Sequence, residues 1–384
     1  MKIKDFIIGL ISQISRLFPK RKNLWLFGAW AGRLYSDNPK YLFEYVNRAH
    51  PEIKALWITR EKRVCDRLKE TGFDACMRFS VKGLFAALRA EAAFIISGEK
   101  SEISPLVNPK RTKVIQLWHG VGPKAHNWID KNGNTRYSGK NIARLSSYYW
   151  MAASEKNIED FNVSMGIPKE RFYITGYPRN DTFVTKPEST AIGNLRKLYS
   201  GARIIMYMPT HRNFGAESIS IEVFLWLDKE LADNNLVMVY KPHFHELKHV
   251  MHYESKFHNI VLAKDQNVWG DPYEYIHDVD LLISDYSSII YDFLCSGKPI
   301  VLYNYDLEKY KTNDSGLCDY YESIPLGPFC NSWSEVMKNV VLLLENDTWQ
   351  ERRKKARGIF HPFDDGCNSE RVFNTVVHNV LTRQ

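Results

Sequence analysis

The chain has 384 residues, which is enough for two domains of ordinary size that each bury a core of their own. Hydrophobic residues make up 44% of it and charged residues 25%, a composition that excludes a disordered chain. Lysine and arginine outnumber aspartate and glutamate by 52 to 44, so the surface attracts polyanions: nucleic acid, anionic lipids or phosphate-bearing substrates.

The six cysteines show neither a C-x-x-C pair nor zinc-ribbon spacing, which predicts reduced thiols in a cytosolic protein. No apolar run reaches the roughly 18 to 20 residues that a transmembrane helix needs. No small-residue cleavage site follows the first apolar stretch, so no secretory signal is predicted either.

Residues 1–22 have the pattern of an amphipathic helix. Apolar side chains between Phe6 and Phe18 fall on one helical face, and basic side chains such as Lys4 and Arg16 flank or oppose it. Such a helix can lie in a membrane interface with its basic side chains on anionic headgroups. We therefore expect a peripheral attachment to the cytoplasmic face of the cell membrane; the alternative is a helix docked on the protein core.

Residues 23–185 alternate short β-rich runs with helical patterns, as in a parallel sheet built from βαβ units. Residues 193–384 repeat this pattern, after a polar stretch at 186–192. The sequence thus predicts two Rossmann-type α/β domains that face a central cleft, with ligands at the carboxyl ends of the strands. The predicted strands are 23–27, 55–58, 93–96, 114–117, 149–153 and 172–175, then 203–207, 236–240, 260–262, 280–283 and 299–303.

His119 follows the predicted strand 114–117 and precedes Gly120, Gly122 and Pro123, which indicate a tight turn. A histidine titrates near neutral pH, so it can accept a proton from an attacking hydroxyl. The residue is therefore a candidate general base. The alternative is a structural histidine that caps the strand.

Further candidates follow other predicted strands. Arg179 and Arg212 offer planar forks for phosphate oxygens, and Thr210 adds a hydroxyl and a backbone N–H. Lys241 and His243 can both face an anionic donor. His243 also begins a group with two further histidines that suggests a metal site; such a site would need ligands at helical i, i+4 spacing with a carboxylate nearby, and this alternative is disfavoured.

A buried run at 280–283 leads into Ser287 and Ser288, and then into a helix expected to end at Gly297. Two hydroxyls and unbonded backbone N–H groups at a helix start can bind an anion. The alternative is ordinary capping of the helix by a serine or aspartate.

Taken in order, these motifs resemble the CDP-glycerol glycerophosphotransferase family, whose members build wall teichoic acid and some capsule polymers. Each motif is weak alone, and the ordered set is specific. The matching segments are 35–40 (YSDNPK), 118–120 (WHG), 175–181 (TGYPRND), 209–212 (PTHR), 241–243 (KPH), 284–288 (SDYSS) with Asp292, and 365–366 (DG) with Ser369 and Arg371.

The resemblance implies a GT-B-like fold in which residues 23–185 bind the acceptor and residues 193–384 bind the CDP-linked donor. It implies that His119 is the base and that His243 serves the donor phosphates or the leaving group, with no catalytic metal and no cofactor. Asp292 would orient a donor hydroxyl or hold a neighbouring basic group. The substrate-binding positions are Gly120, Lys124, Arg179, Pro209, Thr210, Arg212, Lys241, Ser287, Ser288 and Asp292.

Two features depart from the family pattern. The turn after the histidine reads Gly-Val-Gly-Pro-Lys at 120–124, where Gly-Thr-Pro-Leu-Lys is common, so a threonine hydroxyl on the acceptor side is missing. From its length, we expect the chain to differ from the large polymerising members, which carry an extra N-terminal domain, and a primase-like role and a short-polymerase role stay open.

The expected reaction transfers glycerol phosphate from CDP-glycerol to a hydroxyl of a lipid-linked, teichoic-acid-type acceptor and releases CMP. Ribitol phosphate as the transferred group, a capsule polymer as the acceptor, and a nucleotide-sugar glycosyltransferase of GT-B fold are the alternatives. A nucleic-acid-binding protein is disfavoured, because the basic residues are scattered and no recognition motif is present.

Overall fold

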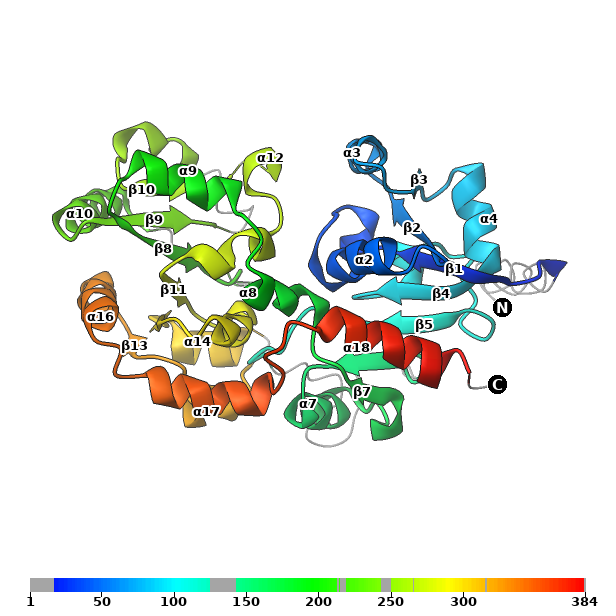
Figure 1. The fold of residues 1–384 in the computed structure, drawn as a ribbon. Coiled ribbons are helices and arrows are strands. Elements are labelled where there is room, and N and C mark those ends of the chain that lie inside the picture. The colour runs from blue at the N-terminus through cyan, green and yellow to red at the C-terminus, as the bar shows by residue number, and fades with distance from the viewer. Residues whose placement is uncertain are drawn as a thin grey trace. The chain divides into compact units, whose positions relative to one another are not determined.

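A computed structural model describes residues 17–124, 143–212, 214, 219–242, 250–264, 266–314 and 316–382. Most of the predicted amphipathic segment 1–22 and the candidate His243 lie outside these described residues. The chain forms two compact units (Figure 1). The first unit comprises Met1–His119, Trp128–Asp181 and Asp365–Gln384, and the second comprises Gly120–Asn127 and Thr182–Asp364.

The first unit contains a seven-stranded sheet in the order β3-β2-β1-β4-β5-β6-β7, and every pair of neighbours is parallel. In such a sheet the carboxyl ends of all strands lie along one edge, where ligands bind. The strands are β1 (Arg21–Phe27), β2 (Lys54–Thr59), β3 (Ala75–Met77), β4 (Ala90–Ile95), β5 (Lys113–Gln116), β6 (Tyr149–Ala152) and β7 (Phe172–Ile174).

Helices connect these strands, and serines begin several of them. Ser80 and Ser154 accept hydrogen bonds from the first-turn amides of α4 and α7, and Gly166 ends α7 in a left-handed conformation. The helices are η2 (Trp30–Gly32), α2 (Asp37–Ala49), α3 (Lys62–Glu70), α4 (Val81–Arg89), α5 (Glu99–Glu102), α7 (Glu155–Met165), η3 (Lys169–Arg171), η4 (Pro178–Asp181), α18 (Asn368–Thr375) and the π-turn η9 (Val376–Val380).

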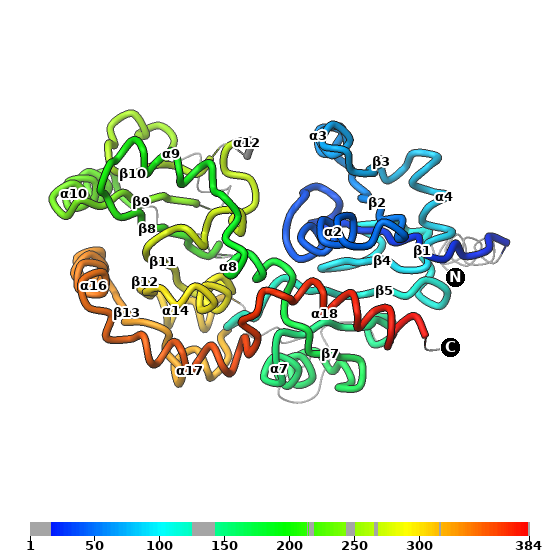
Figure 2. The backbone as a smooth tube through the Cα atoms, viewed as in Figure 1, coloured from blue at the N-terminus to red at the C-terminus, as the bar shows by residue number. Residues whose placement is uncertain are grey.

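The core of the first unit is aromatic, and the end of the chain completes it. Trp25 and Phe27 from β1 pack on Phe94 with ring centroids 5.1 and 4.6 Å apart. Phe373 from α18 lies 5.4 Å from Trp25. Figure 2 shows α18 beside β7 of the same unit, although the two elements are far apart in the sequence. The last helix is therefore part of the first unit, whereas a boundary read along the sequence at 193 assigns it to the second half.

The second unit contains a six-stranded parallel sheet in the order β10-β9-β8-β11-β12-β13. Two parallel α/β sheets confirm the predicted fold class at that level. The strands are β8 (Arg203–Met208), β9 (Leu236–Tyr240), β10 (Ile260–Leu262), β11 (Leu281–Ser284), β12 (Ile300–Tyr303) and β13 (Phe329–Cys330).

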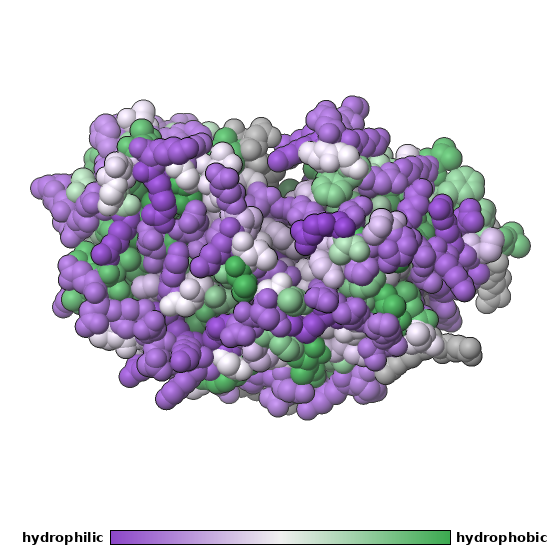
Figure 3. All heavy atoms as spheres, viewed as in Figure 1, coloured by the Kyte–Doolittle hydropathy of each residue, from purple (hydrophilic) through white to green (hydrophobic). Residues whose placement is uncertain are grey.

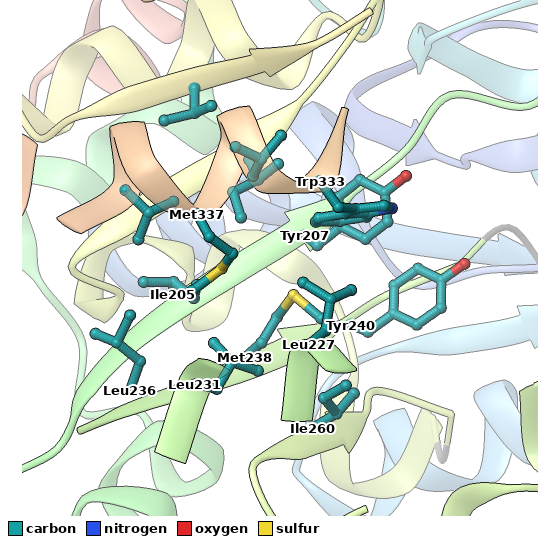
Figure 4. Packing of buried hydrophobic residues seen from close by; sticks show 14 of the residues in the cluster. Ile205, Tyr207, Leu227, Leu231, Leu236, Met238, Tyr240, Ile260, Trp333 and Met337 are labelled. Carbon is teal, nitrogen blue, oxygen red and sulfur yellow. The ribbon is translucent and has the colours of Figure 1, made fainter. Parts of the chain in front are cut away.

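Helices α10 and α16 contribute apolar side chains to the core of the second unit (Figure 4). Tyr207 stacks on Tyr240 with ring centroids 5.0 Å apart and meets Trp333 edge-on at the same separation. The helices are α8 (Thr182–Thr185), α9 (Thr190–Leu198), α10 (Ile221–Asp233), η5 (Glu254–Lys256), α12 (Gln266–Trp269), η6 (Pro272–Glu274), η7 (Ile276–Asp278), α13 (Ile289–Asp292), η8 (Phe293–Ser296), α14 (Leu307–Asn313), α15 (Tyr320–Ser323), α16 (Trp333–Glu345) and α17 (Gln350–Phe360).

The eleven predicted strands are all present with small shifts at their ends, and β3 and β13 were not predicted. Both missed strands are short, with only three and two residues, and so carry little periodicity. Gly297 ends the helix after the serine pair in a left-handed conformation, as predicted. Hydrophilic residues predominate on the face drawn in Figure 3. In the described part of the chain, no helix has both the length and the apolar composition that crossing a bilayer requires.

Candidate functional site

The candidate base His119 lies in a strained turn at the carboxyl edge of the first sheet. β5 ends at Gln116, and the chain reverses through Trp118 with a φ of 54° and Gly120 with a φ of 121°. A tryptophan rarely adopts such a φ, and a glycine does so readily. The Gln116 side chain accepts a hydrogen bond from the Trp118 amide at 3.0 Å, which holds the turn. Backbone strain of this kind is concentrated at functional sites.

The ring of His119 is half-buried between two indoles. It stacks on Trp118 with centroids 4.4 Å apart, and the half-exposed Trp30 lies 5.8 Å away. Nδ1 lies 3.3 Å from the carbonyl oxygen of Ile96. A carbonyl oxygen only accepts hydrogen bonds, so Nδ1 carries the proton of the neutral ring and the lone pair is on Nε2. This is the tautomer that a general base requires.

The start of α2 holds the backbone of the His119 turn. Asn38 donates from its side-chain amide to the carbonyl oxygens of Leu117 and Trp118, at 3.2 and 2.9 Å. The side-chain oxygen of Asn38 accepts a hydrogen bond from the amide of Arg179 at 3.2 Å. Asn38 is fully buried, so these bonds tie β5, α2 and η4 together without competition from water.

Arg179 also supports this turn. Its guanidinium is 3% exposed, pairs with the carboxylate of Asp37 at 2.8 Å and donates to the carbonyl oxygen of His119 at 3.0 Å. A buried carboxylate neutralises much of its charge. The structure thus places Arg179 beside the candidate base, with its described contacts made inside the first unit. Its predicted role as a phosphate ligand stays a prediction.

The last matching motif of the sequence anchors the end of the chain. Asp181 accepts hydrogen bonds from the amides of Asn368 and Ser369 at 2.8 and 2.9 Å, and from the Ser369 hydroxyl at 2.6 Å. Arg371 donates to the carbonyl oxygen of Thr175 at 3.0 Å and pairs with Asp365. A Cβ on Gly176 would overlap Asn368, so glycine is required there. These motif residues attach α18 to the loop that carries Arg179.

A second constellation lies at the carboxyl edge of the second sheet, around Arg212. Its guanidinium pairs with Asp285 at 2.6 Å and with Asp306 at 2.9 Å, and it is 2% exposed. Burial lowers the pKa of Arg212, but the two carboxylates outweigh burial and raise it. The rings of Tyr286 and Tyr310 flank the guanidinium at 4.9 and 5.4 Å. Arg212 is predicted to bind substrate, but the contacts described for it are structural.

The loop after β8 is fixed to the same carboxylate. The Thr210 amide donates to both oxygens of Asp285, at 2.9 and 3.1 Å. The Thr210 hydroxyl is buried and has no hydrogen-bond partner among the described residues. Pro209 precedes it without a backbone N–H. Because a buried hydroxyl without a partner is costly, Thr210 remains a good candidate for contact with a ligand.

Residues 120–124 pack within the second unit, beside the serine pair. A Cβ on Gly122 would lie 3.7 Å from the Cβ of Ser288, and Tyr320 donates a hydrogen bond to the Gly122 carbonyl oxygen. Ser287 and Ser288 are both partly exposed, and Ser288 precedes α13 without capping it through its side chain. The Ser287 hydroxyl accepts a hydrogen bond from the Ile289 amide at 3.4 Å, so the alternative that a serine caps this helix stays open.

Two lysines lie near this constellation with lowered basicity. Burial lowers the pKa of Lys124, against the opposing effect of Asp285 and Asp314. Burial also lowers the pKa of Lys241, against the effect of Asp271. Lys241 follows β9, and its amide donates to the carbonyl oxygen of Tyr207 at 2.9 Å. An anion bound next to either ammonium group would stabilise its charged form.

Asp292 is fully buried within the second unit. It accepts a hydrogen bond from the Tyr273 hydroxyl at 2.5 Å and lies 3.4 Å from Nε2 of His361. Of the two roles expected for it, the structure thus supports holding a neighbouring basic group. Within the described residues, no group of three or more His, Cys, Asp or Glu side chains is arranged to hold a metal ion.

The structure gathers the predicted residues into two groups. His119 and Arg179 lie together in the first unit. Analysis of the sequence missed residues that support both groups, because the signal for each is a contact across many residues. The second group, in the second unit, contains Gly120, Lys124, Pro209, Thr210, Arg212, Lys241, Ser287, Ser288 and Asp292. The missed residues are Asp37, Asn38 and Asp285, present only within motifs, and Glu102, Asp306, Tyr310 and His361.

Comparison with known proteins shows which chains this one is similar to. The chain is 25% identical over 397 residues to the teichoic acid glycerol-phosphate transferase of Staphylococcus aureus, covering 97% of this chain and 98% of that one. It is 26% identical to the teichoic acid poly(glycerol phosphate) polymerase of Bacillus subtilis, covering 96% of this chain but only 50% of the relative.

The fold is similar to that of a solved structure. The wall teichoic acid polymerase TagF, soaked with CDPG, has a TM-score of 0.75 at 22% identity, with 97% of this chain and 96% of that chain covered. Residues 10–378 match the family described as CDP-glycerol:poly(glycerophosphate) glycerophosphotransferase. The chain therefore belongs to the CDP-glycerol:poly(glycerophosphate) glycerophosphotransferase family, and the resemblance drawn from its motifs is confirmed.

Proposed function

We propose that this enzyme transfers glycerol phosphate from CDP-glycerol to a hydroxyl group of a lipid-linked, teichoic-acid-type acceptor and releases CMP. The observation that carries the proposal is the His119 turn, in which a strained backbone and a carbonyl oxygen hold the imidazole as the Nδ1–H tautomer. Family membership supports the choice of a CDP-linked donor.

In the proposed reaction, an acceptor hydroxyl attacks the phosphorus atom on the glycerol side of the diphosphate. One oxygen–phosphorus bond forms, the bond from that phosphorus to the CMP oxygen breaks, and the hydroxyl proton passes to Nε2 of His119. Positioning and charge neutralisation provide most of the rate enhancement in such phosphoryl transfers.

The second group would hold the donor. Lys124 and Lys241 are cations whose pKa values burial has lowered, so a diphosphate would gain by pairing with them. Thr210 and the serine pair offer further hydroxyl groups for the donor. Arg212 is held by two carboxylates, so its proposed contribution is to position the Thr210 loop. His243 remains a candidate partner of the leaving group.

Mass spectrometry of reaction products tests this proposal. The purified protein is incubated with CDP-glycerol, CDP-ribitol or a UDP-sugar, together with a lipid-linked saccharide acceptor. We expect glycerol phosphate to be added, CMP to be released, and UDP-sugars to be left intact. His119→Ala should lower kcat by at least about a thousandfold and leave the Kd for CDP-glycerol within about threefold.

Other outcomes of this experiment have distinct meanings. Selective turnover of CDP-ribitol would replace the donor and keep the mechanism. Release of UDP would assign the chain to the nucleotide-sugar glycosyltransferases instead. Full turnover by His119→Ala would remove His119 from the reaction.

A further inference from the structure

Glu102 is a fully buried acid that the proposed reaction does not use. It ends the short helix α5, and its Oε2 accepts hydrogen bonds from the amides of Ile96 and Ser97 at 2.9 and 3.1 Å. Its Oε1 accepts one from the Ser97 hydroxyl at 3.1 Å. Burial raises the pKa of Glu102 to about 7, although these hydrogen bonds act in the opposite direction. The carboxyl group is thus poised to change its charge near neutral pH.

Hydrogen bonds connect Glu102 to the candidate base His119 through one peptide group. The N–H of Ser97 and the C=O of Ile96 belong to the same peptide, which follows β4. The N–H donates to Glu102, and the C=O faces Nδ1 of His119 at 3.3 Å. Hydrogen bonds in a chain polarise one another, so donation to a carboxylate makes the carbonyl oxygen a stronger acceptor.

We propose that Glu102 is a positioning residue for His119, acting through the Ile96–Ser97 peptide. The inference rests on the proposed role of His119 as the general base. The ionised carboxylate strengthens the acceptor for Nδ1–H, and so keeps the lone pair on Nε2. It also stabilises the imidazolium that forms when Nε2 takes the proton of the acceptor hydroxyl. The peptide carries this effect without moving a proton itself.

The other ionisable groups around this relay are few among the described residues. Glu99 lies on the same helix and is also fully buried, but it accepts a hydrogen bond from Tyr148 and lies 3.8 Å from the guanidinium of Arg144. Arg179 approaches the His119 backbone, and Asp37 neutralises it. Glu99→Gln is therefore a matched control: it removes a buried charge from the same helix, away from the Ile96–Ser97 peptide.

The test measures kcat and KM for CDP-glycerol from pH 5.5 to 9 in four proteins: wild type, Glu102→Gln, Ser97→Ala and Glu99→Gln. Glutamine keeps an oxygen for the two amides and removes the charge. We expect Glu102→Gln to lower kcat about tenfold to a hundredfold with KM within about twofold. Its acid limb should move to lower pH, because the base then lacks a nearby negative charge.

Ser97→Ala should move the acid limb in the same direction by a smaller amount, because less Glu102 is then ionised at a given pH. The serine hydroxyl favours the ionised carboxylate of Glu102, so its loss raises the pKa of Glu102 further. This variant keeps the buried carboxylate and both amide bonds, so it also serves if Glu102→Gln does not fold. A large shift in Glu102→Gln, a smaller one in the same direction in Ser97→Ala and an unchanged profile in Glu99→Gln are not expected of residues that only stabilise the fold.

The results separate the failure of this inference from that of the proposed function. If His119→Ala is inactive but Glu102→Gln retains wild-type kcat and pH profile, the relay is rejected and the base is kept. Equal losses in Glu102→Gln and Glu99→Gln, with unmoved pH profiles, would likewise reject the relay. If His119→Ala turns over fully, the proposed function loses its base, and the relay falls with it.

Discussion

At the scale of single residues, the two arginines that were predicted to bind phosphate make their described ion pairs with carboxylates. Arg179 pairs with Asp37, and Arg212 pairs with Asp285 and Asp306. Both guanidinium groups are almost fully buried, where an unpaired charge is costly. Each arginine then fixes a loop at the end of a strand. We conclude that their first effect on catalysis is on the geometry of the His119 and Thr210 loops.

Arg179→Lys tests this conclusion. A lysine keeps the charge but has no planar fork, so it cannot pair with Asp37 and also reach the carbonyl oxygen of His119. We expect unfolding to become easier by roughly 2 to 4 kcal/mol, because a buried pair is disrupted, and kcat to fall. Denaturant unfolding and kinetics with CDP-glycerol check both effects.

A phosphate ligand would behave differently from a supporting residue. If Arg179 bound the donor directly, Arg179→Lys would raise KM for CDP-glycerol and leave the stability near that of the wild type. Asp37→Asn serves as the comparison, because it removes the carboxylate from the pair and leaves the guanidinium in place. Similar losses of kcat and stability in the two variants would confirm a shared supporting role.

At the scale of elements, the attachment of α18 through Asp181 gives the first unit a pH-dependent stability. Burial raises the pKa of Asp181 from its ordinary value of 3.8 to about 6, although bonds from Ser369 and Asn368 oppose this. A raised pKa in the folded state means that folding favours the protonated acid. The contribution is therefore fully present below about pH 4 and is lost as pH rises through about 6.

Asp181→Asn should abolish this dependence. Asparagine cannot ionise, so the stability difference between variant and wild type should shift in favour of the variant by up to about 3 kcal/mol between pH 4 and pH 7. Urea unfolding monitored by tryptophan fluorescence measures it, since Trp25 lies against Phe373 of α18. A difference that is constant over this pH range would contradict the assignment.

The elements also show what a sequence can predict here. Strands with continuous apolar runs, such as β8 and β9, were located within a residue of their ends, because a buried parallel strand has a strong local signal. The return of α18 to the first sheet had no such signal. It depends on Phe373 meeting Trp25 and on Asp181 meeting Ser369, contacts between residues far apart in the sequence.

The same distinction holds for the site. His119, Thr210 and the serine pair were found because they directly follow strands and lie in family motifs. Glu102 carries no motif, and its relation to His119 passes through the backbone of Ile96 and Ser97. No pattern of residue types along the chain encodes such a path. The orientation of supporting groups therefore required coordinates.

At the scale of the whole molecule, the proposed lipid-linked acceptor would require a surface that holds the enzyme near a membrane. Apolar side chains that are 51 to 79% exposed surround the beginning of α4 in the first unit. Val81, Phe85 and the basic Arg89 follow each other at helical spacing, and exposed Arg21 and Lys22 begin the neighbouring β1. We call this the α4 patch; its apolar members are Leu17, Phe79, Val81 and Phe85.

The α4 patch joins the predicted amphipathic segment at Leu17, and its combination of aromatic and basic side chains suits an anionic membrane surface.

Val81→Ser combined with Phe85→Ser should lower binding to phosphatidylglycerol vesicles at least about tenfold, because exposed apolar area no longer enters the interface. Arg89→Glu should also weaken vesicle binding, and the loss should be larger at low salt than at high salt. Val163→Ser removes an equally exposed valine from α7 and should bind like the wild type. Vesicle sedimentation measures each variant, and turnover of a water-soluble acceptor should stay unchanged. If the double variant sediments as the wild type does, the α4 patch takes no part in membrane binding.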